Sequence, residues 1–320
     1  MAGTWTPSAR LKKIALEKAQ PLSASLELTY RCNWRCGFCY NPRHHDQRGL
    51  SGDEWLTVLD DLRTLGTLYV ALTGGEPLTH PDCLDNARGV LERAMALRIL
   101  TNGALITEAM ADEIRDLRPM TVEMSLHGSR PETHDRATAT AGSFEGLLRG
   151  LDRLRERGVS MTLKTPLTRL NEDELDSMQA LSEERGVPWR IDPVLTARDD
   201  GDVGPLAWRP SSVALERVYR RLAEAGQLPH EERTVGGVNC GLGRTTLAVD
   251  PEGNVFPCIQ WRKAPLGNVR HTPLLKRWPT SERRNQVAGV ARSANDRMLA
   301  SGDALASFPV CPALAQTSTG

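Results

Sequence analysis

Short apolar runs alternate with amphipathic stretches from about residue 25 to residue 196. Six of these runs have the length and the β-rich composition of strands. The expected strands are residues 25–30, 68–73, 98–101, 121–126, 160–165 and 189–194. The stretches between them carry apolar residues at i, i+3, i+4 and i+7, as at Trp55, Val58, Leu59 and Leu62. This spacing predicts helices with one buried face, and the alternation as a whole predicts an α/β fold with a parallel sheet.

Local signals mark where several of these helices begin and end. Ser51 followed by Glu54 has the form of a capping box and is expected to open the first helix. Asn171, which precedes acidic residues, is expected to open the fifth. Gly158 and Gly186 are expected just after helix ends, because glycine readily adopts the left-handed conformation found there.

The alternation weakens after residue 196. Residues 197–210 contain an acidic run and two prolines, which is typical of a solvated loop. Further on, two short apolar runs flank Asp-Pro-Glu-Gly at 250–253, which predicts a β-hairpin. We therefore expect an N-terminal segment at 1–22, a domain of βα units at 23–200, a linker with one helix at 201–232 and a second domain at 233–320.

Composition narrows the possible partners. The 40 basic and 40 acidic residues cancel, and with a pI near 7.1 the chain offers no broad positive surface for nucleic acid. The first 21 residues lack the continuous apolar stretch of a secretory signal, and no run approaches the ~18 to 20 apolar residues that span a bilayer. We expect no membrane association and a location in the reducing cytoplasm, where the seven cysteines are ligands or core residues.

Three of the cysteines, Cys32, Cys36 and Cys39, lie within eight residues, directly after the first expected strand. Thiolates bind soft metal centres, and a [4Fe-4S] cluster held by three sulfurs keeps one iron free for a small molecule. A structural zinc site remains an alternative, although it would need a fourth ligand, and no fourth lies nearby. A disulfide remains another, although it would need an oxidising compartment. The spacing Cys-x3-Cys-x2-Cys favours the iron-sulfur cluster.

Together with Phe38 before the last cysteine and Gly74-Gly75-Glu76 after the second expected strand, this triad resembles the radical SAM superfamily. The resemblance covers about residues 23–200 and implies an open (β/α)6 partial barrel. It implies that the three cysteines hold a [4Fe-4S] cluster whose free iron binds the amino and carboxylate groups of S-adenosylmethionine (SAM). The residues implied in SAM binding are Phe38, Gly74, Gly75, Glu76, Thr101, Asn102, Ser125 and Lys164.

These positions fall largely at the carboxyl ends of expected parallel strands, where such folds bind ligands. Glycines allow the backbone to come close to a ligand, and Glu76 offers an acceptor for an ammonium group. Ser125 resembles the family's contact to the SAM carboxylate or ribose. Lys164 is either a counter-charge for that carboxylate or a lysine that reaches solvent from a strand end. His127 is either a substrate contact or a structural residue, and we assign it no catalytic role.

A second group of cysteines is expected around the hairpin. The pattern Cys240, twelve residues, Gly253, four residues, Cys258 resembles the opening of the SPASM and twitch extensions of radical SAM enzymes, which carry auxiliary iron-sulfur clusters. Only Cys311 follows, so the full SPASM pattern is not present. The resemblance implies one auxiliary cluster, expected to be [4Fe-4S], with these three ligands and a fourth position filled by a side chain, water or substrate. Two alternatives remain: the thiols are buried and bind no metal, or they bind zinc. Cys83 is expected in the core, and the alternative is a thiol that donates a hydrogen atom to a substrate radical.

The resemblance implies that one electron from the first cluster cleaves SAM to methionine and a 5'-deoxyadenosyl radical, which takes a hydrogen atom from a substrate carbon. The SPASM-like region favours a ribosomally synthesised peptide as substrate, modified by a crosslink, a thioether or epimerisation. A dehydrogenase or maturase acting on a small molecule, or on a cofactor or antibiotic precursor, is the alternative. Expected partners are an electron donor such as flavodoxin or ferredoxin and a separate peptide-recognition protein. An iron-sulfur electron carrier or a redox sensor is a further alternative, which would use the same cysteines but would not require the Gly-Gly-Glu segment.

Overall fold

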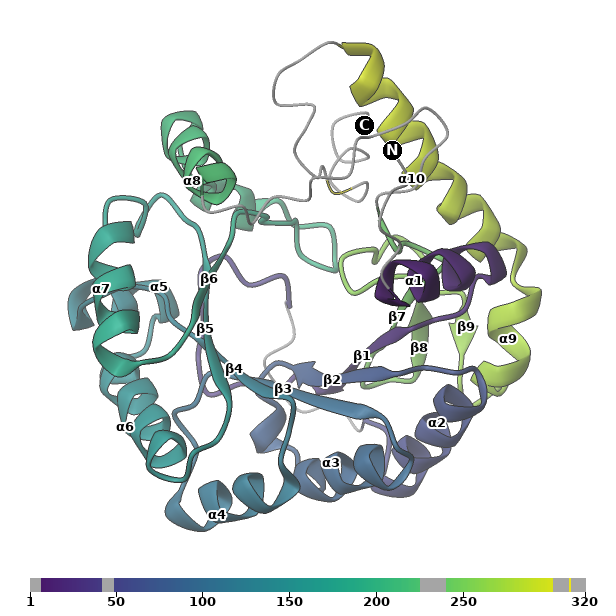
Figure 1. Ribbon diagram of the computed structural model, residues 1–320, viewed down its shortest axis with the longest axis horizontal. Coiled ribbons are helices and arrows are strands. Elements are labelled where there is room, and N and C mark those ends of the chain that lie inside the picture. Colours follow the sequence, from purple (N-terminus) through teal and green to yellow (C-terminus); the bar gives the residue numbers. More distant parts are fainter. Residues whose placement is uncertain (1–6, 42–48, 225–239, 302–310, 312–320) are drawn as a thin grey trace.

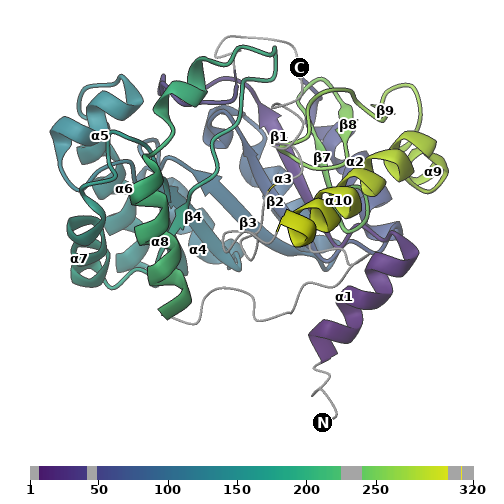
Figure 2. The ribbon, with the colours of Figure 1, turned by 90° about the horizontal axis from the view of Figure 1, so that it is seen from above.

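A computed structural model of the chain describes residues 7–41, 49–224, 240–301 and 311. Within these residues a curved sheet of nine strands encloses a central space, and helices cover its outer face (Figure 1). Helix α1 (Pro7–Lys18) projects from the body on the side of the C-terminal strands (Figure 2). None of the described helices is both long enough and apolar enough to cross a bilayer.

Six neighbouring strands of the sheet run parallel and follow one another in chain order. They are β1 (Ser23–Thr29), β2 (Tyr69–Gly74), β3 (Ala96–Thr101), β4 (Thr121–Ser125), β5 (Met161–Pro166) and β6 (Trp189–Asp192). All six expected strands are confirmed, as is the partial barrel. The main core lies between the sheet and the helices that cover it. Outward-facing strand residues such as Leu26, Leu72 and Ile99 are buried in this core.

The helices that cover the sheet follow the strands in turn. They are α2 (Gly52–Thr64), α3 (Cys83–Glu92), α4 (Glu108–Leu117), α5 (Pro131–Thr138), α6 (Ser143–Glu156) and α7 (Leu175–Arg185), with a 3-10 turn, η1 (Pro77–Thr79), before α3. The four apolar residues predicted for the first of them are buried. Ser51 and Glu54 form the expected capping box. Gly186 ends α7 with φ +66°, as expected, and Cys83 is buried in the core.

The prediction that Asn171 opens the fifth helix is wrong. Helix α7 begins at Leu175, and Asn171 is fully buried before it. Its amide accepts a hydrogen bond from the backbone N–H of Thr168 and donates to the backbone oxygens of His127 and Pro166. Asparagine side chains compete with helices for backbone partners, and here those partners lie at the end of β5 and in the loops that follow β4 and β5.

After η2 (Gly204–Trp208) and α8 (Ser212–Glu224), the chain returns to the sheet. Strand β7 (Thr246–Val249) pairs in parallel with β1, and β8 (Asn254–Phe256) and β9 (Gly267–Asn268) continue the sheet in antiparallel fashion. The expected hairpin is confirmed, and Gly253 takes φ +87° in its turn. Helices α9 (Leu274–Thr280) and α10 (Glu282–Ser301) follow. The C-terminal strands therefore extend the sheet of the partial barrel.

Candidate functional site

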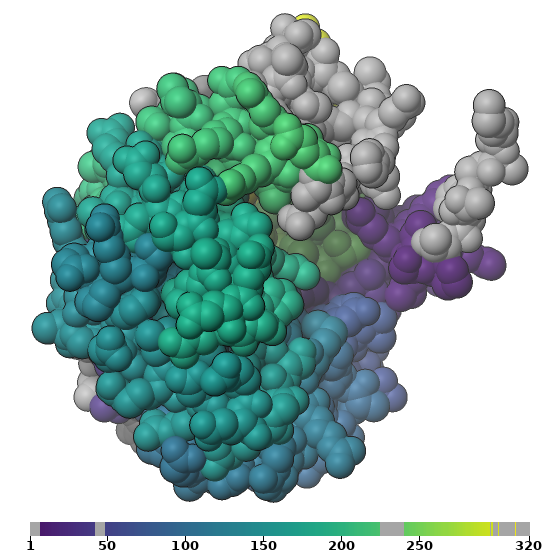
Figure 3. Space-filling model, turned by 60° about the vertical axis from the view of Figure 1, so that its left-hand side comes forward, coloured from purple at the N-terminus to yellow at the C-terminus, as the bar shows by residue number. Residues whose placement is uncertain are grey.

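A cavity of about 840 Å³ lies inside the curve of the sheet. From one side the surface is hollowed between the teal residues that follow β4 and the purple residues of α1, with green C-terminal residues visible deeper inside (Figure 3). The cavity wall combines inward-facing strand residues with the first cysteine loop, the segment 194–203 and residues 259–263. Seven of the eight residues expected to bind SAM line this cavity: Phe38, Gly74, Gly75, Thr101, Asn102, Ser125 and Lys164.

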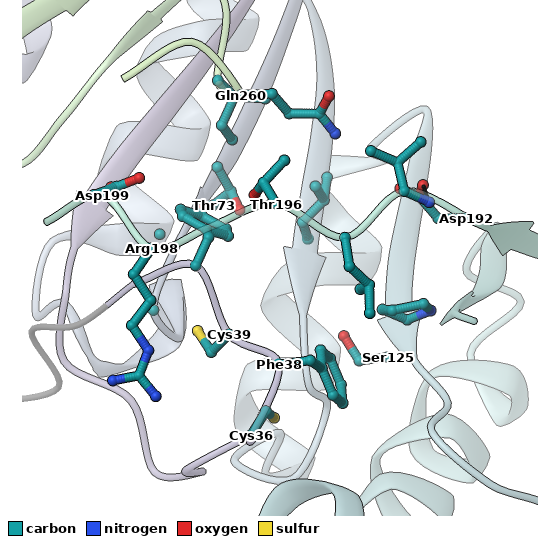
Figure 4. Close-up of a pocket in the computed structure, with 18 of the residues that line it drawn as sticks. Cys36, Phe38, Cys39, Thr73, Ser125, Asp192, Thr196, Arg198, Asp199 and Gln260 are labelled. Carbon is teal, nitrogen blue, oxygen red and sulfur yellow. Dashed lines mark hydrogen bonds between the residues drawn. The ribbon is translucent and has the colours of Figure 1, made fainter. Parts of the chain in front are cut away.

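The three cysteines of the first loop also line the cavity, and Figure 4 shows Cys36 and Cys39 beside Phe38. Backbone N–H groups donate to two of the sulfurs, from Trp34 to Cys32 and from Asn41 to Cys39, each at 3.4 Å. Burial raises the pKa of Cys36 well above its usual value, and the charges of its two neighbours raise it further. Three partly buried thiols that are close enough to influence one another fit a soft, positively charged centre, which would favour their thiolate forms.

No three His, Cys, Asp or Glu side chains in the described part of the chain surround a point where a single metal ion could sit. A [4Fe-4S] cube makes a different demand, because its ligands bind separate corners and need not converge on one atom. The donor set of three thiols therefore fits an iron-sulfur cluster better than a mononuclear site.

Aromatic rings surround the cysteine loop. The ring centroid of His127 lies 5.1 Å from that of Phe38 and 5.8 Å from that of Trp34. On the other side Trp208, in η2, packs against Gly37, where an added Cβ would lie 2.2 Å from the indole ring. Burial lowers the pKa of His127 well below its usual value, so the imidazole is neutral, and its Nδ1 has no hydrogen-bond partner among the described residues. These rings fix the path of the loop between its cysteines.

The two glycines at the end of β2, Gly74 and Gly75, lie directly against the start of the cysteine loop. A Cβ on Gly74, which has φ +132°, would lie 2.3 Å from the carbonyl oxygen of Thr29. A Cβ on Gly75 would lie 2.3 Å from the carbonyl oxygen of Arg31. Both residues must therefore be glycine for this backbone approach, which places the turn beside the cysteines.

Glu76 is the one expected SAM-binding residue that does not line the cavity. Its carboxylate is fully buried and accepts hydrogen bonds from Leu78 N (3.1 Å), Thr101 Oγ1 (2.6 Å) and Asn102 N (2.7 Å). Burial raises its pKa to about 7, despite these donors. The side chain thus joins η1 to the turn that follows β3, and its contact with SAM stays a prediction.

Charged residues on neighbouring strands form pairs inside the cavity. Lys164 on β5 lies 3.3 Å from Asp192 on β6, and Arg98 on β3 pairs with Glu123 on β4. Ser125 ends β4 with its side chain toward the same space (Figure 4). The Lys164 ammonium therefore already has a carboxylate partner, and a ligand carboxylate would compete with Asp192 for it.

The segment after β6 contributes residues that sequence reasoning missed. It is a loop, as expected, but it lines the cavity with Arg198, Asp199 and Asp200 where only a solvated connection was expected. The backbone N–H of Asp199 donates to the carbonyl oxygen of Tyr40, which follows the last cysteine of the loop. No local sequence signal could have indicated this contact, because it depends on how the loop crosses the barrel.

The second group of cysteines lies at the end of the hairpin. Cys240 and Cys258 pack against a small separate core that includes Trp261, and Cys311 Sγ donates to Gln260 Oε1 at 2.9 Å. Burial raises the pKa of Cys258 to about 11, and the charges of the other two thiols act in the same direction, so the three lie near one another. This donor set also fits an iron-sulfur cluster. Because Gln260 and Trp261 line the cavity, the group lies beside it.

Comparisons with known proteins agree with this geometry. Residues 26–181 match the model of the Radical SAM superfamily, and residues 240–301 match the model of SPASM, an iron-sulfur cluster-binding domain. The chain belongs to the radical SAM superfamily. This radical SAM enzyme uses a [4Fe-4S] cluster and SAM, and its SPASM region binds an auxiliary iron-sulfur cluster.

Two curated relatives match most of the chain. The "PqqA peptide cyclase" of Rhizobium meliloti (strain 1021) is 28% identical over 327 residues, covering 91% of this chain and 87% of that protein. The "AdoMet-dependent heme synthase" of Methanosarcina barkeri (strain Fusaro / DSM 804) is 26% identical, covering 84% and 85%. Among solved structures, Streptococcus suis SuiB bound to S-adenosylmethionine has a TM-score of 0.73 at 16% identity, covering 98% of this chain and 79% of that chain. This last likeness shows the fold.

Proposed function

We propose that this radical SAM enzyme modifies a ribosomally synthesised peptide, with Cys32, Cys36 and Cys39 holding the cluster that binds SAM. The observation that carries the cluster assignment is the loop, which directs three thiols into the cavity that seven of the expected SAM-binding residues line. When bound, the reduced cluster supplies the electron that cleaves SAM to methionine and a 5'-deoxyadenosyl radical, the species that takes hydrogen from the substrate.

The protein's own residues bind and enclose SAM in this proposal. Ligand pockets commonly measure roughly 300 to 1,000 Å³, so a cavity of about 840 Å³ has room for SAM and part of a substrate. Lys164 would hold the SAM carboxylate by exchanging Asp192 for it, and Ser125 would donate to the carboxylate or ribose. Trp34, Phe38 and His127 keep water from the cysteine loop.

The peptide substrate is proposed from the relatives. One of them is named as a cyclase of the PqqA peptide, and it matches nearly the whole chain. An electron donor such as flavodoxin or ferredoxin, a separate peptide-recognition protein and a cytoplasmic location belong to the same proposal. The second candidate is a maturase acting on a cofactor precursor, which the likeness to the heme synthase favours.

Replacing the three cysteines of the first loop together with alanine tests the cluster assignment. Anaerobic reconstitution followed by measurement of 5'-deoxyadenosine should show no SAM cleavage above background. Cleavage at the wild-type rate would contradict the assignment. The exposed Asp85→Asn variant, reconstituted in parallel, controls for losses during handling.

Coexpression with short open reading frames that neighbour the gene tests the substrate. A crosslink or thioether lowers the mass of the peptide by two hydrogens, and epimerisation in deuterated water adds one deuterium. If tetrapyrrole precursors, but no such peptide, stimulate formation of 5'-deoxyadenosine, the second candidate is correct.

We further propose that Cys240, Cys258 and Cys311 hold the auxiliary cluster of the SPASM region. The variant that lacks the first three cysteines should then retain roughly four irons per chain, the content of one [4Fe-4S] cluster. A folded variant that binds no iron would show that these thiols are structural.

A further inference from the structure

A buried group of charges lies between the two sets of cysteines. Arg262 Nη2 lies 2.5 Å from Glu27 Oε2, with side chains 9% and 0% exposed. The hydroxyl of Tyr40 donates to the other oxygen of Glu27, also at 2.5 Å. The guanidinium lies 4.7 Å from the ring centroid of Phe256. Ion pairs this far from water are rare unless their members are held by several partners, as these are.

This group joins the segments that carry the cysteines. Tyr40 follows Cys39 directly, and Arg262 lies four residues after Cys258. Glu27 comes from β1, the strand that leads into the first cysteine loop and pairs with β7. Asp199 lies 3.7 Å from Arg262 Nε and donates its N–H to Tyr40. Figure 4 shows Asp199 and Gln260 at the wall of the cavity that also holds Cys39.

The described residues satisfy only part of the hydrogen-bonding capacity of the Arg262 guanidinium. Nη2 binds Glu27 and Nε donates to the carbonyl oxygen of Ile259 at 2.7 Å. Nη1 is buried and has no hydrogen-bond partner among the described residues. A buried donor without an acceptor is costly, so a group of this kind is expected to face an acceptor when the protein is complete. The bond to Ile259, the residue directly after Cys258, holds the guanidinium beside the second group of cysteines.

We propose that Arg262, held in place by Glu27 and Tyr40, is a positioning residue that sets the reduction potential of the auxiliary cluster. The proposal rests on the proposed function, which assigns that cluster to Cys240, Cys258 and Cys311. Adding an electron makes a cluster more negative, so a positive charge close by favours the reduced form and raises the potential. Burial strengthens the effect, because water and salt screen the charge poorly there.

The test uses the full chain with Cys32, Cys36 and Cys39 replaced by alanine, so that only the auxiliary cluster remains. Its potential is measured anaerobically by EPR-monitored titration with dithionite, which gives one electron to the cluster and breaks no protein bond. In this background Arg262→Gln removes a positive charge and should lower the potential. Glu27→Gln removes a negative charge and should raise it. Both substitutions break the same ion pair, so damage to packing alone would not move the potential in opposite directions.

Two further variants complete the design. Arg270 and Glu54 form another arginine–glutamate pair between the C-terminal part and α2, but their side chains are 39% and 38% exposed. Arg270→Gln should therefore leave the potential unchanged. Arg262→Lys keeps the positive charge, so its reduction potential should stay closer to that of the parent than the potential of Arg262→Gln does. If Arg262→Gln does not fold, the Glu27→Gln variant decides alone, since an upward shift supports the proposal and any other result overturns it.

The outcomes separate this inference from the function on which it rests. A folded parent chain without iron would show that the proposed ligands are wrong, and the inference fails with them. A parent with iron whose potential shifts the same way in both charge variants, or does not shift, would overturn the role of Arg262 alone and leave the auxiliary cluster in place.

Discussion

The buried carboxylate of Glu76 allows a prediction with a defined pH dependence. Replacing it with glutamine keeps the shape of the side chain but turns one oxygen into an NH2 group. The two carboxylate oxygens of Glu76 accept hydrogen bonds from three donors. In the variant at least one donor, for example the N–H of Asn102, would face the new NH2 group and lose its acceptor. A buried N–H without a partner costs about 1 to 3 kcal/mol, so Glu76→Gln should be less stable by this amount in acid.

The difference should shrink as the pH rises. Burial raises the pKa of Glu76 from 4.5 to about 7, so the folded protein holds a proton that the unfolded chain releases. Stability is then highest below pH 4.5 and is lost as the pH rises toward 7. A shift of about 2.5 units corresponds to roughly 3 kcal/mol, and glutamine, which does not titrate, escapes this loss. Near pH 8 the variant should be about as stable as the parent.

Urea unfolding of the iron-free chain, followed by circular dichroism from pH 5 to pH 8, measures both effects. Glu54→Gln is the control, because hydrogen bonds from Arg270 lower the pKa of Glu54 to about 2, below this range. Its stability should run parallel to that of the parent. Parallel curves for Glu76→Gln as well would refute the reasoning.

SAM affinity is a separate measurement on the same residue. If Glu76 also binds the SAM ammonium, Glu76→Ala should retain iron and bind SAM about ten- to a hundredfold more weakly, the effect of losing one charged hydrogen bond of ~1.5 to 3 kcal/mol. An unchanged dissociation constant would limit Glu76 to its internal contacts.

Two other variants probe the surroundings of the cysteine loop. Gly37→Ala would place a methyl group 2.2 Å from the indole of Trp208, so cluster loading should fall and should recover in the double variant with Trp208→Ala; equal loading in all three would contradict this contact. The ring centroid of His134, on α5, lies 5.3 Å from that of Trp34 in the cysteine loop. Burial lowers the pKa of His134 from 6.5 to about 4, so the unfolded state takes up the proton first and stability falls by about 3 kcal/mol between pH 6.5 and pH 4. His134→Gln should reduce this loss of stability in acid, measured by urea unfolding, and an unchanged pH dependence would contradict the lowered pKa of His134.

The barrel could be predicted from the sequence because its strands and helices carry their own periodicity. Strand β2 is a short run that is buried on both faces from Val70 to Thr73, and α2 combines one apolar face with a capping box, so local signals and fold agree. The prediction for Asn171 failed because its side chain found backbone partners in neighbouring loops, which no local pattern shows.

The site could be predicted only where the residues that carry its chemistry lie close together in the sequence. The cysteine spacing and the Gly-Gly-Glu segment are of this kind. Arg262 and Glu27 are not, because 235 positions separate them and they meet only through the pairing of β1 with β7. Glu76 lies between the two cases, since the motif identified the residue but gave no sign that its carboxylate would be buried among backbone donors.

The place of β1 in the sheet has a consequence for biosynthesis. The strand pairs with β2 on one side and with β7 on the other. While the ribosome makes the 200 or so residues between β1 and β7, at roughly 5 to 20 residues per second, one edge of β1 stays without its partner for about 10 to 40 s. An apolar strand with a bare edge can pair with other chains. The nascent protein therefore needs protection until residue 249 has emerged, and any stop in synthesis before that point would leave an aggregation-prone product.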